Sequence, residues 1–556
     1  IEASYSNQTE ALSLGVVLSE PENGAVARIL GLPGRPAVDL SLDGAGPISD
    51  FEAGLSLSTN DVERATGTFG FISETGDDGM ERLDMRADIR GDIGALLPSE
   101  YADFFGADSR LAVQAERRET GEIALPVLTV ETQHLALDGS ALIDAGGWPR
   151  RLSLSGLVAS EDGSPVLLPL AGEKTFVDRA TLEIGFDEAA GNEWTGAFRL
   201  DGLERPGLTI SELTLAGEGE IVPRNGDVPG RFDGKVNYAA LGLALDDPGL
   251  ALAVGPEIEG DLHVARTGDG PVRIDRLSLN GPGLAVDAEA QVAGPGEDFT
   301  TNATLRLDAG DLSRFAVLAG LDGLGGAASL GIVSEIEPLN GIFSVMMSGS
   351  TDDLALGIAE LDPLLTGEGT LALAADRDET GARVSAVRIV TDEAQITGSA
   401  DLTSDVIDAI VELDIRDLGL AVDGLSGPAR IRAVAERRPG GATGITADLT
   451  ARGIEGRAVA RIARQSDGGT ISGETTLDIA EIAPLARLAG QDISGAIDLS
   501  VSGEAAPGFE TFDVTLDGTA TNIDPGVAQL RPLLAGEVQL DAALSRDVDG
   551  RISVER

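Results

Sequence analysis

The feature that most constrains this chain is a two-residue alternation of apolar and polar side chains that returns along its length. Residues 111–121 read LAVQAERRETG, and residues 371–381 read LALAADRDETG, which is nearly the same segment. A related strand, IRAVAERR, occupies residues 431–438. Because successive side chains of a β-strand point to opposite faces, each segment has one apolar and one polar face. The alternation therefore predicts a repetitive chain that is mostly β-strand.

The repeated unit is longer than one strand. Residues 363–381 align without a gap to residues 532–550, and both segments open with Pro-Leu-Leu and contain a later Arg-Asp before a glycine. Such a unit joins a short apolar segment, a strand and a polar glycine turn. Units of this kind are expected near residues 92–145, 311–350, 360–402, 424–462 and 479–556. No Pro/Ser-rich linker divides the sequence, so we expect residues 1–556 to form one continuous array, a piece of a longer chain.

Short apolar segments interrupt the strands. Four of them are DIGALLPSE from Asp92, DLSRFAVLAG from Asp311, IAEIAPLARLAG from Ile479 and LRPLLAG from Leu530. Asp92 and Asp311 stand where a helix N-cap is expected, and Gly320 follows the last apolar residue of its segment, where a helix would end. These segments predict helices of one or two turns.

The number of strands bounds the architecture. If one strand occurs about every 12 residues, the chain holds on the order of 45 strands, too many for one barrel. At about 4.8 Å between neighbours, they would extend roughly 200 Å. Aromatic residues, which usually fill a β-sandwich core, make up only 3% of the chain. We therefore expect an all-β fold, an elongated curled sheet or open solenoid with a few short helices. The apolar faces either meet in a dry core, which periodicity alone favours, or leave a trough for a lipid chain.

Composition excludes several classes of function. The chain has 40 basic and 93 acidic residues, a formal net charge of −53, and no cysteine. A chain this acidic repels a phosphate backbone, which argues against nucleic acid as a partner. The lack of cysteine excludes disulfides, thiol chemistry and zinc fingers. No apolar run reaches the roughly 18 to 20 residues that span a bilayer.

No group of residues predicts catalysis or metal binding. His134 and His263 each lack a second imidazole or thiol nearby, so we expect both on strand faces. The GLGGAA segment at 323–328 precedes a strand-like segment instead of a helix, which argues against a dinucleotide site. Several acidic turns lack the spacing of calcium loops, among them residues 77–79, 269–270 and 547–550. We expect no metal, no cofactor and no enzymatic activity.

Two further segments carry a family resemblance. Residues 43–57 (DGAGPISDFEAGLSL) lead from a Gly-Pro turn into a strand, and residues 296–320 (GEDFTTNATLRLDAGDLSRFAVLAG) join a strand to an Asp-Leu-Ser helix. Together with the LxPLxxG-type segments, such as residues 361–367 and 530–536, they resemble the middle of the TamB family. This family supplies the inner-membrane subunit of the translocation and assembly module of Gram-negative envelopes and is related to AsmA-like proteins. The resemblance lies in the repeat design and covers most of the chain.

The resemblance implies a periplasmic curled sheet of the β-taco kind, whose apolar groove carries phospholipid between the inner and outer membranes. It also implies an inner-membrane anchor outside this chain, an outer-membrane barrel subunit as partner and a part in outer-membrane protein assembly. The sequence shows neither the family's N-terminal membrane helix nor its complete C-terminal domain, so docking at either membrane is not predicted. With the resemblance included, the trough becomes the expected filling.

The apolar strand faces are therefore the candidate site. Apolar surface can hold phospholipid acyl chains without specific contacts, while the acidic opposite face keeps an exposed sheet in solution. The residues expected to line a lipid groove are Leu111, Val113, Ala115, Leu371, Leu373, Ala375, Ile431, Ala433, Leu540 and Ala542. The expected function is a non-enzymatic phospholipid conduit. The alternatives are a structural or adhesive exported β-solenoid with a dry core, and a polysaccharide-acting β-helix enzyme, which the shortage of aromatic residues argues against.

Overall fold

The structure, a computed structural model, is a single antiparallel sheet that is not closed into a barrel. It describes residues 2–6, 10–29, 31–47, 49–75, 81–170, 172–403, 406–439, 441–463, 470–488, 490–506, 510–527, 529–547 and 549–555. Contacts divide the chain into two compact units. The N-terminal unit is Ile1–Pro282 with Glu289–Gln291, and the C-terminal unit is Gly283–Ala288 with Val292–Arg556. The predicted all-β fold is confirmed.

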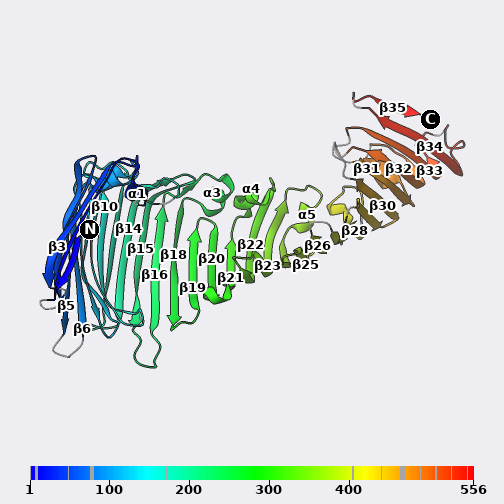
Figure 1. The fold of residues 1–556 in the computed structure, drawn as a ribbon. Helices are drawn as coiled ribbons and strands as arrows, with labels where there is room; N and C mark the ends of the chain where they lie inside the picture. The colour runs from blue at the N-terminus through cyan, green and yellow to red at the C-terminus, as the bar shows by residue number, and fades with distance from the viewer. Residues whose placement is uncertain are drawn as a thin grey trace. The chain divides into compact units, whose positions relative to one another are not determined.

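The N-terminal unit contains strands β1 to β19 (Figure 1). They are β1 (Glu2–Ser6), β2 (Ala11–Glu20), β3 (Val38–Pro47), β4 (Asp50–Thr59), β5 (Val62–Thr75), β6 (Glu81–Gly91), β7 (Ser109–Arg118), β8 (Ile123–Glu131), β9 (Leu135–Ile143), β10 (Pro149–Ala159), β11 (Val166–Leu167), β12 (Phe176–Val177), β13 (Arg179–Asp187), β14 (Glu193–Arg205), β15 (Leu208–Val222), β16 (Arg231–Leu241), β17 (Ala244–Leu245), β18 (Glu257–Thr267) and β19 (Val272–Gly281). The boundary between the units falls within β20 (Leu284–Val292).

The C-terminal unit contains the remaining strands. They are β21 (Thr301–Ala309), β22 (Leu324–Glu337), β23 (Ile342–Leu356), β24 (Glu368–Arg377), β25 (Gly381–Val390), β26 (Ala394–Thr403), β27 (Ile407–Ile415), β28 (Ala429–Arg437), β29 (Thr443–Ala451), β30 (Ile454–Ala463), β31 (Thr470–Ile479), β32 (Ser494–Ala505), β33 (Phe512–Asp524), β34 (Glu537–Arg546) and β35 (Ile552–Glu555). From β21 onward each strand pairs antiparallel with the next strand in the sequence.

The helices are short and gather at one edge of the sheet in each unit. They are α1 (Ala25–Ile29), η1 (Ile93–Leu96), α2 (Ala102–Phe105), α3 (Pro248–Val254), η2 (Pro295–Glu297), η3 (Leu312–Phe315), α4 (Ala316–Ala319), α5 (Asp362–Leu365), η4 (Leu418–Leu420) and α6 (Ala483–Leu488). Strand direction alternates, and all of these helices except η2 follow strands that run toward the same edge. Figure 1 shows α1 and α3 along this edge of the N-terminal unit. We call this border, which is formed by the ends of the strands, the helical edge. The border formed by the opposite strand ends is the turn edge.

Two predicted helix caps are confirmed. The Asp92 carboxylate accepts a hydrogen bond from Ala95 N at 3.2 Å, and the Asp311 carboxylate accepts one from Ser313 N at 3.0 Å. Gly320 ends α4 in the left-handed region at φ 65°, which glycine adopts without strain. The helix predicted from Leu530 is wrong. Residues 530–533 form turns and residues 534–536 form a bend. Leu533 N and Leu534 N both donate to Leu530 O, but no later backbone bond of this described segment continues them into a helix.

The expected strand number was too high. The described residues form 35 strands instead of about 45, because most strands run nine to fifteen residues and the spacing of strands along the chain is wider than 12 residues. The alternating segments chosen from the sequence nevertheless fall inside strands. Residues 111–115 lie in β7, residues 371–375 in β24, and residues 431–435 in β28.

Glycines on the sheet allow close approach of neighbouring strands. A Cβ at Gly349 in β23 would overlap the carbonyl oxygen of Ser329 in β22. Gly331 of β22 lies on the opposite face of the sheet from Gly349. A Cβ at Gly331 would lie 3.6 Å from Ser348 O, which is an ordinary contact. We therefore expect Gly349→Ala to destabilise the C-terminal unit by about 1–3 kcal/mol and Gly331→Ala to change its stability by less than about 1 kcal/mol. Denaturant unfolding of the two variants checks this, and equal effects would contradict the close approach.

Candidate functional site

The apolar face of the C-terminal unit is continuous across its strands. A first row of cross-strand partners contains Leu307, Leu330, Gly349, Leu371, Ile389, Ile396, Leu413, Ile431, Leu449, Gly456, Leu477, Leu499, Gly518 and Leu540. Each residue in it is the register partner of the next. Directly opposed residues of neighbouring strands project from the same face of a sheet. The predicted residues Leu371, Ile431 and Leu540 thus belong to one row.

A second row runs beside the first, two residues nearer to the turn edge. It contains Leu305, Ile332, Met347, Leu373, Val387, Gly398, Val411, Ala433, Ala447, Ala458, Thr475, Val501, Leu516 and Ala542. Leu373, Ala433 and Ala542 were predicted from the sequence. Ala375, also predicted, pairs with Val345 and Val384 one step further along the same face. The structure therefore brings all seven predicted residues of this unit onto one face.

The N-terminal unit has an apolar face of the same design. The row through Leu111 contains Val16, Leu42, Leu55, Gly67, Ile89, Leu111, Val130, Leu137, Gly156, Leu182, Phe198, Leu215, Tyr238, Gly260 and Leu279. Val113 pairs with Ala87 and Leu128, and Ala115 pairs with Met85, on the same face. The three predicted residues of this unit share its apolar face.

These rows are not covered by another layer of the protein. No residue of the three rows named above is buried, although their side chains are mostly apolar. Val411, in the middle of β27, is 49% exposed, and Leu111 is 38% exposed. Phe69, the register partner of Ala87, is 41% exposed. In a dry core, side chains at such positions would be close-packed and inaccessible to solvent. The apolar faces are therefore open along the middle of the strands.

The buried core lies instead near the helical edge. In the C-terminal unit, Leu364 of α5 packs with Ala394, Ile415 and Ala429, which lie at the helical-edge ends of their strands. In the N-terminal unit, Phe104 of α2 packs with Val166, Val177 and Leu200. The helices thus cover one border of each apolar face and leave the rest open.

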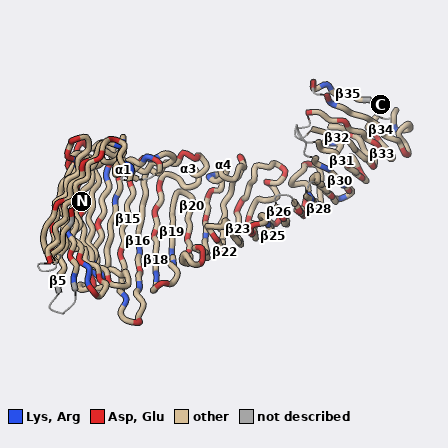
Figure 2. The backbone as a smooth tube through the Cα atoms, viewed as in Figure 1, with Lys and Arg blue, Asp and Glu red and all other residues tan. Residues whose placement is uncertain are grey.

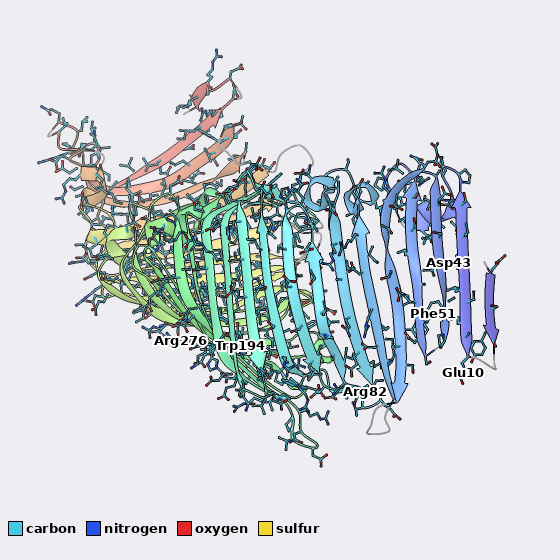
Figure 3. The ribbon with its side chains drawn as sticks, turned by 90° about the vertical axis from the view of Figure 1, so that its left-hand side faces the viewer. Glu10, Asp43, Phe51, Arg82, Trp194 and Arg276 are labelled. Carbon is cyan, nitrogen blue, oxygen red and sulfur yellow. The ribbon has the colours of Figure 1, made fainter. Side chains whose placement is uncertain are left out.

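Aromatic side chains lie flat on the apolar face. Trp194 lies in β14 of the N-terminal unit (Figure 3). Its ring stacks on the ring of Phe232 with the centroids 5.9 Å apart, and its Nε1 donates to Asp233 O at 3.1 Å. A Cβ at Gly217 would lie 2.8 Å from the Trp194 ring, and one at Gly234 would lie 2.9 Å from it. The indole therefore occupies the space above two glycines of β15 and β16 and does not project toward an opposing layer.

The opposite face of the sheet is polar. Arg383 pairs with Asp401 at 3.1 Å, and Arg432 pairs with Glu412 at 3.3 Å, in both cases between register partners. Hydrogen bonds from Arg110 lower the pKa of the Asp88 carboxyl below its ordinary value. Figure 2 shows basic and acidic residues distributed along both units. Such exposed pairs add little stability each, but they keep this face hydrated.

Each of the two histidines has a ring nitrogen close to a carboxylate oxygen. His263 lies in β18 as predicted, and its Nε2 is 3.0 Å from Asp233 Oδ1. The prediction for His134 is wrong, because it lies in the turn before β9 and not on a strand. It is 8% exposed there, with Nδ1 3.3 Å from Ala159 O and Nε2 3.5 Å from Asp103 Oδ2. Among the described residues, no group of three or more potential ligands could hold a metal ion.

The remaining sequence motifs form strands and turns. The GLGGAA segment at 323–328 runs into β22, so no helix follows it. Gly270 N donates to Thr267 O in the turn that contains Asp269, and Gly550 N donates to Asp547 O in the last acidic turn. Residues 77–79 lie outside the described residues, as does Val548.

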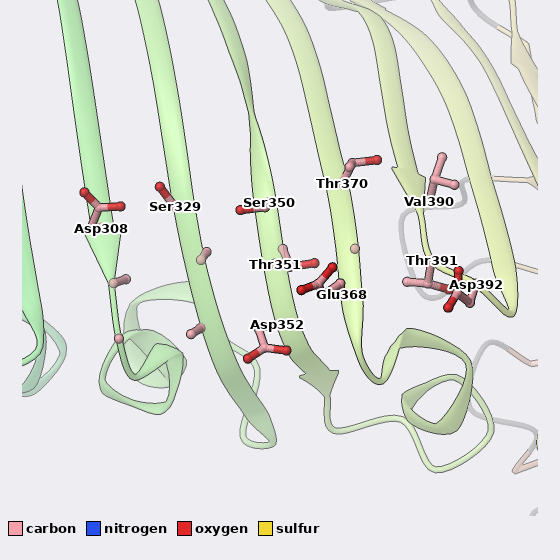
Figure 4. Close-up of a pocket in the computed structure, with 15 residues that line it drawn as sticks. Asp308, Ser329, Ser350, Thr351, Asp352, Glu368, Thr370, Val390, Thr391 and Asp392 are labelled. Carbon is pink, nitrogen blue, oxygen red and sulfur yellow. The ribbon is translucent and has the colours of Figure 1, made fainter.

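A hollow of about 820 Å³ crosses β21 to β25 close to the helical edge. Its polar side chains include those of Asp308, Ser329, Ser350 and Thr370 (Figure 4). Asp308, Ser329, Ser350 and Thr370 form a row of register partners on the polar face. The lining also includes Ala309, Ala328, Thr351 and Gly369, which are register partners on the apolar side, so both faces contribute residues to the hollow.

Comparisons with known proteins identify no relative. No family model matches the sequence, and neither a curated protein nor a solved structure matches it. Among the described residues, none of the helices has both the length and the apolar character needed to cross a membrane. The candidate site is thus defined by geometry alone, as the open apolar face of each unit.

Proposed function

We propose that this chain is a non-enzymatic periplasmic conduit, which holds phospholipid acyl chains on its apolar faces and lets them pass between the inner and outer membranes. The observation that supports this most strongly is the exposure of the apolar rows. The successive rows of register partners consist largely of leucine, isoleucine, valine and alanine, and no other layer of the described protein covers them. A soluble sheet with such a face needs an apolar partner to cover it.

Acyl chains suit this surface on energetic grounds. Transfer of each methylene from water to an apolar surface contributes about 0.8 kcal/mol, without directional contacts. Neighbouring strands offer similar side chains about 4.8 Å apart, so a lipid that moves by one strand meets an equivalent surface. Within each unit, movement along the rows therefore changes the binding energy little from strand to strand.

The rival function, a structural or adhesive solenoid, requires a dry core. The described rows do not fit it, because their side chains are partly or largely exposed. The resemblance to the TamB family adds the outer-membrane barrel subunit as the partner and outer-membrane protein assembly as a second role. Both belong to the proposal through that resemblance.

Mass spectrometry of ligands extracted from the purified chain tests the function. We expect phospholipid in an amount of at least one molecule per chain after gel filtration without detergent. Removal of the lipid should leave the β-sheet signal in circular dichroism unchanged, since the lipid is not part of the hydrogen-bonded sheet. The proposal would be contradicted if the chain is purified without bound lipid and does not take up phospholipid from mixed micelles.

A further inference from the structure

Five arginines occupy one repeated place, at the turn edge of the apolar face. Arg117 ends the apolar-face positions of β7, where Leu111, Val113 and Ala115 precede it at two-residue intervals. The same place is taken in other strands by Arg266 of β18, Arg377 of β24, Arg437 of β28 and Arg546 of β34. We call these five residues the rim arginines.

The register places each rim arginine beside a large apolar residue. On the preceding strand the partners of Arg117, Arg266, Arg377, Arg437 and Arg546 are, in that order, Leu83, Phe232, Phe343, Ile407 and Phe512. All of these partners continue the apolar face toward the turn edge. The rim arginines are therefore on the apolar side of the sheet, at its border with water.

This location differs from that of the arginines on the polar face. Arg383 and Arg432 pair with acids on neighbouring strands. Within the described part of the chain, Arg117 and Arg377 form no ion pair, although the protein is highly acidic. Arg266 donates to Gly270 O at 3.3 Å, and Arg437 and Arg546 also have interactions within the protein. The nearest acidic turn residue, Asp378, directs its carboxylate to its own turn, where it accepts from Thr380 N and Gly381 N. A cation beside an apolar surface matches an amphiphile with an anionic head.

We propose that the rim arginines bind the phosphate of the lipid head group, so that each phospholipid lies across the strands with its head at the turn edge and its acyl chains toward the helical edge. The inference rests on the proposed function. The helices and the core beneath them cover the other border, so the turn edge is where a charged head group stays hydrated. A planar guanidinium donates two parallel hydrogen bonds to a phosphate. Within each unit, the repeated arginines offer the head group successive binding partners.

A head-group comparison tests the orientation. Purified chain is incubated with phosphatidylglycerol or with diacylglycerol of the same acyl chains, and the lipid retained per chain is measured after gel filtration. We expect about tenfold more phosphatidylglycerol than diacylglycerol to be retained at low salt. The Arg377→Gln/Arg437→Gln/Arg546→Gln variant should lose most of this preference while its retention of diacylglycerol is unchanged. Lysine at the same three positions should restore the preference in part.

The matched control removes three arginines from the polar face, as Arg383→Gln/Arg432→Gln/Arg457→Gln. It should keep the head-group preference, which rules out a general loss of positive charge as the cause. Equal retention of both lipids by the unaltered chain, or an equal loss of preference in the control, would overturn the inference and leave the proposed function standing. Retention of neither lipid would contradict the proposed function itself. Displacement of phosphatidylglycerol by inorganic phosphate alone would also overturn the inference, because acyl-chain binding would then add nothing to the affinity for the lipid.

Discussion

Replacing both Leu373 and Val411 by aspartate is expected to lower the bound phospholipid per chain roughly twofold or more, while the sheet remains folded. Both residues lie in the second apolar row. Without lipid, a carboxylate at the half-exposed Val411 position stays hydrated. Under an acyl chain it would be an unpaired charge in apolar surroundings, which costs several kcal/mol. Mass spectrometry of bound lipid and thermal melting by circular dichroism measure the two effects.

The chain offers a closely matched control for this experiment. Val459 of β30 is 41% exposed, against 49% for Val411, and it lies on the polar face as the register partner of Thr446 and Glu474. Val459→Asp together with Ala374→Asp adds the same two charges to that face. This variant should bind as much lipid as the unaltered chain. A similar loss of lipid in both variants would show that charge or misfolding, and not the apolar face, is responsible.

Leu364→Ala is expected to destabilise the C-terminal unit by about 2–5 kcal/mol, because this side chain of α5 is 1% exposed and belongs to the core at the helical edge. Leu371→Ala removes the same atoms from the first apolar row, where part of the surface is already in water, and should cost only about 1 kcal/mol. The difference follows directly from the placement of the core.

Hydrogen exchange across α5 and β24 is the suitable measurement, because a long sheet need not unfold in one step and local stability is the relevant quantity. Protection should fall strongly in the Leu364→Ala variant and slightly in the Leu371→Ala variant. Equal and large losses would mean that the apolar rows are themselves a packed core. That result would favour the dry solenoid over the conduit.

The faces of the strands could be predicted from the sequence. The alternation through Leu371, Leu373 and Ala375 assigns these residues to one face, because the period of a strand is two and no bulge interrupts β24 against β23. The assignment of Leu371 and Leu540 to the same row could not be predicted. It depends on the register of every pair between them, including the shift against β25 at Ala374.

The alternation alone could not predict that the apolar face is open and favoured a dry core; the trough was expected only through the family resemblance. A strand with one apolar face has the same pattern whether that face meets a second layer or remains uncovered. The face of the rim arginines follows from the alternation, because Arg377 and Arg546 continue the two-residue spacing of the apolar positions in their strands. Their apolar neighbours, Phe343 and Phe512, depend on the strand register and could not be predicted.

The pairing of most strands with their sequence neighbours has a consequence for how the chain folds. In the C-terminal unit each pairing closes a short loop, so the entropy lost before contacts form is small. Hairpins can form in any part of this unit and extend strand by strand, as in other repeat proteins. A chain of this kind does not have to wait for its last residues before it gains structure, which suits a long polypeptide that emerges slowly, one end first, during synthesis or export.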